Sequence, residues 1–130
     1  MKFPSKKEIV EANRKATAVN GDPFVVSNEA AVEHLVDALK YKYNDKPERE
    51  ALLLKAAYLL NFVAGKAHAF VEGNKRTAVT LTLAFLKRNG LPLDTRDQEE
   101  LVKFTLSVAS GKESTSSVKR WLEQRIKIRP

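Results

Sequence analysis

Apolar residues recur along most of this chain with the spacing of amphipathic helices. In the clearest case, Val32, Leu35, Val36 and Leu39 stand at i, i+3, i+4 and i+7, which places them on one helix face. Strand-like alternation is nearly absent, and only the apolar, β-branched stretch 24–26 is typical of a short extended piece. The pattern predicts an all-α, bundle-like domain of about six helices with one short extended flap.

Capping residues and helix breakers indicate where these helices begin and end. Ser5 and Glu8 have the spacing of a capping box at the start of a first helix. The turn signal Asn20-Gly21-Asp22-Pro23 ends that helix. Further helices are expected to begin at Ser27 or Asn28, at Pro47, at Thr77, at Asp94 or Thr95, and within Ser114–Ser117.

The third of these helices is the most apolar part of the chain. Twelve of the 14 residues from Ala51 to Ala64 are apolar, so the helix is hydrophobic almost all round. Such a helix normally lies at the centre of a helical domain rather than on its surface. It is expected to lead directly into a break between His68 and Gly73, which precedes the fourth helix.

Length, charge and composition narrow the class of protein. The 130 residues fit one domain, residues 1–130, and the absence of cysteine excludes disulfides and thiolate metal sites. No apolar segment reaches the ~20 residues that span a bilayer, and charges interrupt the N-terminal stretch where a signal peptide needs an apolar run. A cytoplasmic protein is therefore expected. The net charge of +7 favours anionic partners, whether nucleic acid, nucleotide phosphates or an acidic protein segment.

The residues that indicate chemistry lie together at the start of the fourth helix. The free N–H groups at a helix N-terminus and the positive end of its dipole form a natural anion site. Gly73 allows a close backbone approach, Asn74 can donate from its amide, and Lys75 and Arg76 add two cations. Cations oppose the dipole at this end of a helix, which is a local conflict expected at a functional site.

Glu72 and His68 add the two other groups that nucleotide-dependent transfer needs. Glu72 offers an oxygen ligand of the kind that Mg²⁺ takes alongside phosphates, and His68 can accept a proton near neutral pH. Each residue also has a plainer interpretation: a histidine that caps or packs, a Gly-Asn turn, solvated cations, and Phe70 as an apolar plug against the core. Only their combination favours phosphoryl-transfer chemistry.

The run HAFVEGNKRT, residues 68–77, resembles the signature of the Fic/Doc superfamily, HxFx(D/E/N)(G/A)N(K/G)R. The resemblance implies a helical enzyme that uses ATP and Mg²⁺ to modify a hydroxyl of another protein. By this resemblance His68 deprotonates the hydroxyl and Glu72 holds the metal ion. Gly73, Asn74, Lys75 and Arg76 surround the nucleotide phosphates.

Two positions in and after the motif bear on which part of ATP is transferred. AMP-transferring members have glycine at the position of Lys75 and a second arginine at the position of Val79. Both departures resemble Doc-type toxins, which transfer the γ-phosphate to a threonine of translation elongation factor Tu. Gly73, where Doc has alanine, keeps AMP transfer as the alternative.

The resemblance also implies a flap and an inhibitor. Residues 20–27 match the flap that would hold the target segment by backbone pairing. Self-inhibited members carry a helix of pattern (S/T)xxxE(G/N). The nearest match, Thr95 to Glu99, is followed by Glu100 instead. A separate, Phd-like antitoxin is therefore expected to control the protein.

A nucleic-acid-binding helical module is the main hypothesis from another class. The last helix carries the cations Lys119, Arg120, Arg125, Lys127 and Arg129. Trp121, Leu122 and Ile126 would use one face of that helix for packing, which argues against a duplex-binding surface. A scaffold that binds nucleotide without transfer is a further alternative. Metal hydrolysis is set aside because His34, expected near the surface, and His68 do not have metal-ligand spacing.

Overall fold

The computed structural model describes residues 1–126, and within that range it contains six α-helices, one π-helical turn and no β-strand. The helices are α1 (Lys6–Asn20), α2 (Glu29–Tyr41), α3 (Glu48–Asn61), α4 (Asn74–Arg88), α5 (Thr95–Ala109) and α6 (Thr115–Arg125). The π-helical turn, η1 (Phe62–Lys66), continues α3. The all-α prediction is confirmed, and the expected extended piece is reduced to a single bridge between Val26 and Phe70.

Most of the helices begin where the capping residues predict. Ser5 and Glu8 form the capping box of α1, and the side chains of Asn28, Asp94 and Ser114 cap α2, α5 and α6. Helix α4 is the exception, because it begins at Asn74, three residues before the predicted start at Thr77. Its first turn therefore contains Lys75 and Arg76.

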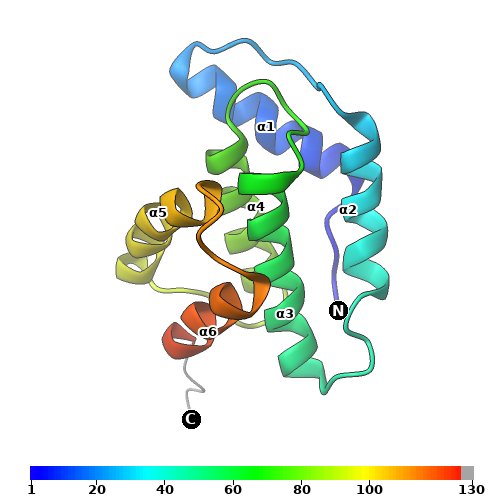
Figure 1. The fold of residues 1–130 in the computed structure, drawn as a ribbon, viewed down its shortest axis with the longest axis vertical. Coiled ribbons are helices and arrows are strands. Elements are labelled where there is room, and N and C mark those ends of the chain that lie inside the picture. The colour runs from blue at the N-terminus through cyan, green and yellow to red at the C-terminus, as the bar shows by residue number, and fades with distance from the viewer. Residues whose placement is uncertain (127–130) are drawn as a thin grey trace.

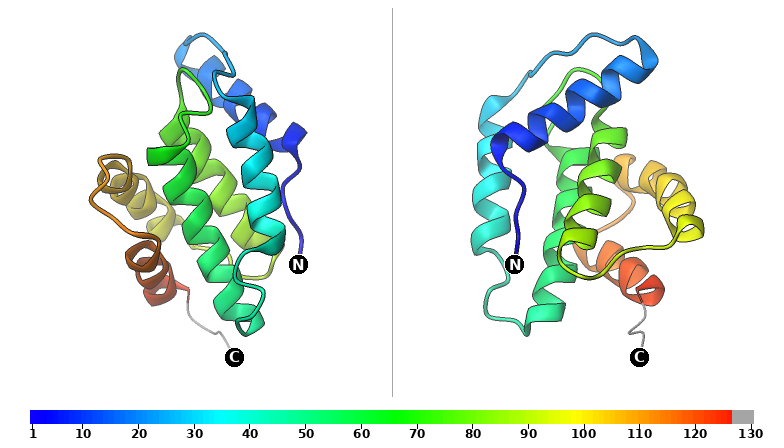
Figure 2. Two further views of the ribbon diagram at one scale, coloured as in Figure 1. Left: turned by 45° about the vertical axis from the view of Figure 1, so that its right-hand side comes forward. Right: turned by 180° about the vertical axis from the view of Figure 1, so that it is seen from behind.

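Helix α3 lies in the middle of the molecule. Figure 1 shows α2 on one side of α3 and α5 and α6 on the other, while the views in Figure 2 show α4 packed along α3. Helix α1 crosses α4 at the end of the molecule where η1 leads into the loop before α4. Leu53, Ala56, Ala57, Leu59 and Leu60 of α3 are fully buried. The prediction of a central buried helix is confirmed.

One charged side chain also lies in the core of α3. Lys55 is 1% exposed, and its Nζ donates to the Leu39 carbonyl and to Asn44 Oδ1 at the end of α2. Burial disfavours the charged form and lowers the pKa of Lys55. Among the described helices none combines the length and the apolar composition needed to cross a membrane.

Candidate functional site

The chain approaches the candidate site through a local widening of α3. The backbone forms the π-helical turn η1 after Asn61, and Ala67 N–H donates to the Phe62 carbonyl at 2.7 Å. Such turns occur often at functional sites, where they change the direction of the chain. Gly65 in this turn contacts α5 so closely that an added Cβ would lie 2.9 Å from the Val108 carbonyl oxygen. The turn ends at Lys66, two residues before His68.

His68 is exposed and has an unusual backbone conformation. Its φ of 45° lies in the left-handed region, which is uncommon for residues other than glycine. The two neighbouring residues, Ala67 and Ala69, are buried. Ser27 Oγ donates to the His68 carbonyl at 2.7 Å. The backbone of His68 thus has a left-handed conformation, and the two residues beside it are buried in the core.

The flap pairs with the residues that follow His68. Val26 bridges Phe70 in the antiparallel sense, Val71 N–H donates to the Val25 carbonyl at 3.1 Å, and Ser27 N–H donates to the Ala69 carbonyl at 2.9 Å. Phe70 is 2% exposed, so its predicted role as an apolar plug is confirmed. The flap and the buried Phe70 together fix the path of the loop.

The N-terminus of α4 has no side-chain cap. Gly73 is the N-cap residue, with a φ of 78°, and its carbonyl accepts the first helical hydrogen bond from Thr77 N–H at 2.9 Å. The N–H groups of Asn74, Lys75 and Arg76 precede that bond and therefore have no partner within the helix. The side chains of Lys75 and Arg76 are exposed. This end of α4 can accept an anion, as the sequence predicts.

Two amide side chains hold the loop in place, and the sequence indicated neither contact. Asn74 Nδ2 donates to the Phe70 carbonyl at 2.7 Å, and Phe70 N–H donates to Asn74 Oδ1 at 3.3 Å. From α1, the fully buried Asn13 donates to the Glu72 carbonyl at 2.8 Å and to Thr77 Oγ1 at 3.1 Å. The Asn74 amide thus closes the turn, in addition to any role toward a ligand.

Gly73 is closely packed against α1. A Cβ at this position would lie 3.2 Å from Asn13 Nδ2 and 3.2 Å from Thr17 Cγ2, and the left-handed φ already disfavours a side chain. Both close contacts are with α1, where Asn13 and Thr17 are buried. Glycine at residue 73 therefore has a structural reason as well as the predicted functional one.

A cavity of about 640 Å³ opens beside this turn. The flap lines it with Asn20 and Asp22, and α5 lines it with Val102, Thr105 and Leu106. All of the predicted cofactor and metal residues line it as well, namely Glu72, Gly73, Asn74, Lys75 and Arg76. His68 is not among the lining residues. The structure therefore brings five of the six predicted site residues around one cavity and leaves the histidine exposed outside it.

Two acidic residues line the cavity, the predicted metal ligand Glu72 and Asp22 of the flap. No group of three or more histidine, cysteine or acidic side chains that could hold a metal ion occurs in residues 1–126. Mg²⁺ commonly uses only one or two carboxylates and completes its coordination with phosphates and water. An exposed carboxylate beside an uncapped helix N-terminus therefore fits Mg²⁺ bound together with a nucleotide.

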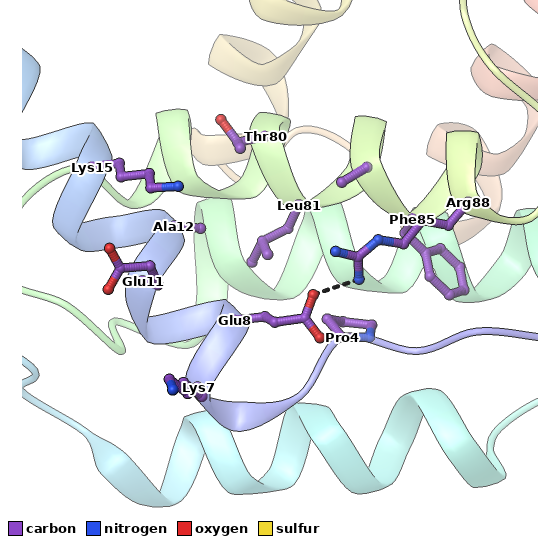
Figure 3. A pocket seen from close by; sticks show the side chains of 11 residues that line it. Pro4, Lys7, Glu8, Glu11, Ala12, Lys15, Thr80, Leu81, Phe85 and Arg88 are labelled. Carbon is purple, nitrogen blue, oxygen red and sulfur yellow. Dashed lines mark ion pairs between the residues drawn. The ribbon is translucent and has the colours of Figure 1, made fainter.

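A second cavity, of about 410 Å³, lies between α1 and α4. Figure 3 shows Ala12, Leu81 and Phe85 at its apolar floor, with Lys7, Lys15 and Arg88 around them. An ion pair between Glu8 and Arg88 links the two helices across this groove. None of the predicted site residues lines it. Thr80 lines both cavities, so they lie on adjoining faces of α4.

Several residues considered for other chemistries have structural partners. The ring of His34 is exposed, as predicted, and its Nε2 lies 2.7 Å from the Tyr58 hydroxyl. In α6, Lys119 pairs with Glu123 at 2.9 Å, and Arg125 stacks on Trp121 and pairs with Glu100. Of the other three cations proposed for duplex binding, Arg120 is exposed, and Lys127 and Arg129 lie outside the described residues. The described part of α6 thus uses two of its cations in intramolecular contacts.

Comparisons with known proteins agree with this geometry. The sequence matches the model of the Fic/DOC family over residues 5–86, which covers more than half of the chain and includes the flap, the loop and most of α4. It is also similar to the protein kinase doc of Escherichia phage P1, with 27% identity over 118 residues that span 91% of this chain and 90% of the phage protein. The similarity therefore extends well beyond the motif, over most of the chain. The chain belongs to the Fic/DOC family.

Proposed function

We propose that this protein is a Doc-like toxin that transfers the γ-phosphate of ATP to a serine or threonine hydroxyl of another protein. One observation supports this most strongly. The uncapped N-terminus of α4, the two cations of its first turn and Glu72 line one cavity, and the exposed His68 lies four residues before Glu72 in the same loop. Phosphoryl transfer depends mainly on such positioning and charge stabilisation rather than on covalent chemistry by the protein.

The cavity suits a nucleotide with Mg²⁺. Its volume of about 640 Å³ is within the usual range for small-molecule sites. The N–H groups of the first turn, with Lys75 and Arg76, can bind phosphate oxygens, and Arg76 can bind two at once through its guanidinium. The Glu72 carboxylate would hold the metal ion. ATP bound there would supply the phosphoryl group that is transferred.

His68 would act as the general base. It would take the proton from the target hydroxyl, a contribution of roughly 10²–10⁴-fold to the rate. An exposed imidazole outside the nucleotide cavity suits a protein substrate, since a large target cannot enter a closed pocket. The flap, residues 20–27, would hold the target segment, and its residues Asn20 and Asp22 already line the cavity.

Transfer of the γ-phosphate is favoured over transfer of AMP by two residues at the cavity. Lys75 adds a charge where AMP-transferring members have glycine, and Val79 lines the cavity without offering a phosphate ligand. Similarity to a protein named as a kinase also supports transfer of the γ-phosphate. AMP transfer is the alternative, on the evidence of Gly73. By resemblance, the target is translation elongation factor Tu, and a separate Phd-like antitoxin restrains the cytoplasmic enzyme.

Labelled ATP distinguishes these reactions. The purified protein is incubated with Mg²⁺ and a bacterial lysate, using ATP labelled on the α- or the γ-phosphate, and transfer into protein is measured. We expect label only from the γ-position. Label from the α-position would make the protein an AMP transferase, and no transfer from either would contradict the proposal.

Matched variants distinguish a loss of function at the site from a general effect of mutation. His68→Ala is expected to lower transfer at least 100-fold, whereas His34→Ala removes the other histidine, on α2, and should leave the rate within about twofold of the wild type. Arg76→Ala should weaken ATP binding, while Arg96→Ala, which removes an arginine that is 88% exposed on α5, should not. Equal losses in both members of a pair would indicate a general effect on folding.

A further inference from the structure

Two non-glycine residues in the described range have a positive φ, Tyr43 at 67° and His68 at 45°. A left-handed backbone is disfavoured for residues with a Cβ, so it persists only where neighbouring structure holds it. Tyr43 lies in the turn after α2, away from the loop. His68 is the residue proposed to move the proton, so the contacts that hold its backbone bear on the reaction.

The flap supplies these contacts. Ser27 Oγ donates to the His68 carbonyl at 2.7 Å, and Ser27 N–H donates to the next carbonyl, that of Ala69, at 2.9 Å. In residues 1–126, Ser27 is the one side chain hydrogen-bonded to the backbone of His68. It reaches the histidine from 41 residues earlier in the chain. One residue thus fixes two successive carbonyls at and after His68.

We propose that Ser27 is a positioning residue for His68: its hydroxyl holds the left-handed backbone that directs the imidazole toward the target hydroxyl. This inference rests on the proposed function of His68 as the base. Ser27 touches only the backbone of the histidine and takes no part in proton transfer. Without the hydroxyl, the His68 carbonyl loses its hydrogen bond to the flap, and the backbone of His68 can relax to the more favourable right-handed region.

Kinetics test the proposal with three variants. Ser27→Ala removes the hydroxyl and Ser27→Thr keeps it. Ser110→Ala is the matched control, because Ser110 Oγ also donates to a backbone carbonyl, that of Ser107, at 2.8 Å in the turn after α5. We expect Ser27→Ala to lower kcat for γ-phosphate transfer by about 5- to 20-fold with little change in the KM for ATP. Ser27→Thr and Ser110→Ala should stay within about twofold of the wild type.

A double-mutant cycle shows whether Ser27 acts through the histidine. In the His68→Ala background, replacing Ser27 by alanine should cause no further loss of the residual rate, because the group it positions is already absent. If the loss is as large as in the wild-type background, Ser27 acts by another route and the proposal is wrong.

Imidazole NMR signals provide a readout that does not depend on activity. The chain has only two histidines, so the signals can be assigned with His34→Ala and His68→Ala. Ser27→Ala should shift or broaden the His68 signal and leave the His34 signal unchanged, while Ser110→Ala should move neither. An unchanged His68 signal in Ser27→Ala would overturn the proposal. Absence of transfer by the wild type would contradict only the proposed function, since the NMR result stands by itself.

Discussion

Buried and half-buried amides, rather than charged groups, close the loop that carries the site. Asn74 bonds both backbone groups of Phe70, and Asn13 bonds the Glu72 carbonyl from α1. Neutral amides suit this task because an acidic side chain in their place would neutralise the positive end of α4. Asn13 Oδ1 has no partner among the described residues, so the contribution of Asn13 rests on its donor group.

Removing the Asn13 amide should therefore destabilise the protein. Asn13→Ala leaves the Glu72 carbonyl without its partner and opens a small cavity, and we expect a loss of about 1–3 kcal/mol in the free energy of unfolding. Urea denaturation measures this change. Asn20→Ala, which removes an exposed amide at the end of the same helix, should change the stability by less than about 0.5 kcal/mol. Equal stabilities of the two variants would contradict the role given to Asn13.

At the scale of elements, the contact between η1 and α5 determines where the loop begins. Helix α5 lines the cavity with Val102 and Leu106, and η1 lies just before His68 in the chain. The contact between η1 and α5 therefore sets the position of His68 relative to this wall of the cavity. Gly65 allows this contact because its missing side chain leaves room for the Val108 carbonyl. Packing against α5 thus leaves no room for a side chain at this position of the π-helical turn.

Gly65→Ala distinguishes packing from helix propensity. Alanine is the better helix former by about 1 kcal/mol, so propensity alone predicts a more stable protein. The close contact with Val108 predicts the opposite, a loss of about 1–3 kcal/mol from overpacking. Thermal unfolding decides the sign, and a rise in the melting temperature would show that η1 moves freely relative to α5.

Helices α1 and α4 are joined across the groove in Figure 3 by the pair Glu8 and Arg88. The Arg88 guanidinium, and then the Ser5 N–H, lower the pKa of Glu8 from its ordinary value. A lowered pKa in the folded state means that the stabilisation is complete above the ordinary carboxylate pKa. It is lost as the pH falls through the lowered value. Both side chains are more than a third exposed, so the contribution is small, below about 1 kcal/mol.

The pH dependence of Glu8→Gln should show this contribution. Glutamine retains the capping-box acceptor for Ser5 N–H but cannot pair with Arg88 as an ion. We expect the variant to be slightly less stable than the wild type at pH 6 and the difference to vanish as the pH falls through the lowered pKa of Glu8. Urea denaturation at several pH values measures it. A difference that persists unchanged in acid would mean that capping, and not the ion pair, is affected.

For the whole molecule, the net charge of +7 does not by itself select a nucleic acid as the partner. In the described part of α6, two cations have acidic partners and Trp121 packs on Phe104. At the other end of the molecule, Lys75 and Arg76 lie at a cavity rather than on a continuous basic face. This distribution favours a compact anion over a long duplex.

Duplex binding should accordingly be weak. In about 0.15 M salt we expect a dissociation constant of roughly 10⁻⁵ M or weaker for a short DNA or RNA duplex, as for sequence-independent contacts. Fluorescence anisotropy at several salt concentrations measures it. Tight binding that falls steeply with salt, and that is unaffected by Arg76→Ala, would instead support the hypothesis of a nucleic-acid-binding module.

The sequence by itself determined the helical class, most helix starts and the residues of the motif. Capping residues such as Ser5 and Asp94 accept hydrogen bonds from N–H groups a few residues away. Their effect can therefore be predicted from the neighbouring residues in the sequence. The anion-binding turn is predictable for the same reason, because Gly73 through Arg76 are consecutive. The predicted start of α4 at Thr77 is three residues late, since Gly73 and Asn74 favour turns in isolation.

Only the tertiary structure decided what surrounds that motif. Asn13 meets Glu72 across 59 positions and Ser27 meets His68 across 41, and no local pattern relates such pairs. The wall of the cavity on α5, the π-helical turn and the left-handed backbone of His68 likewise depend on how helices pack. The physical reason is that capping and periodicity act within one or two helical turns, whereas loop geometry is set by contacts that form only when distant elements meet.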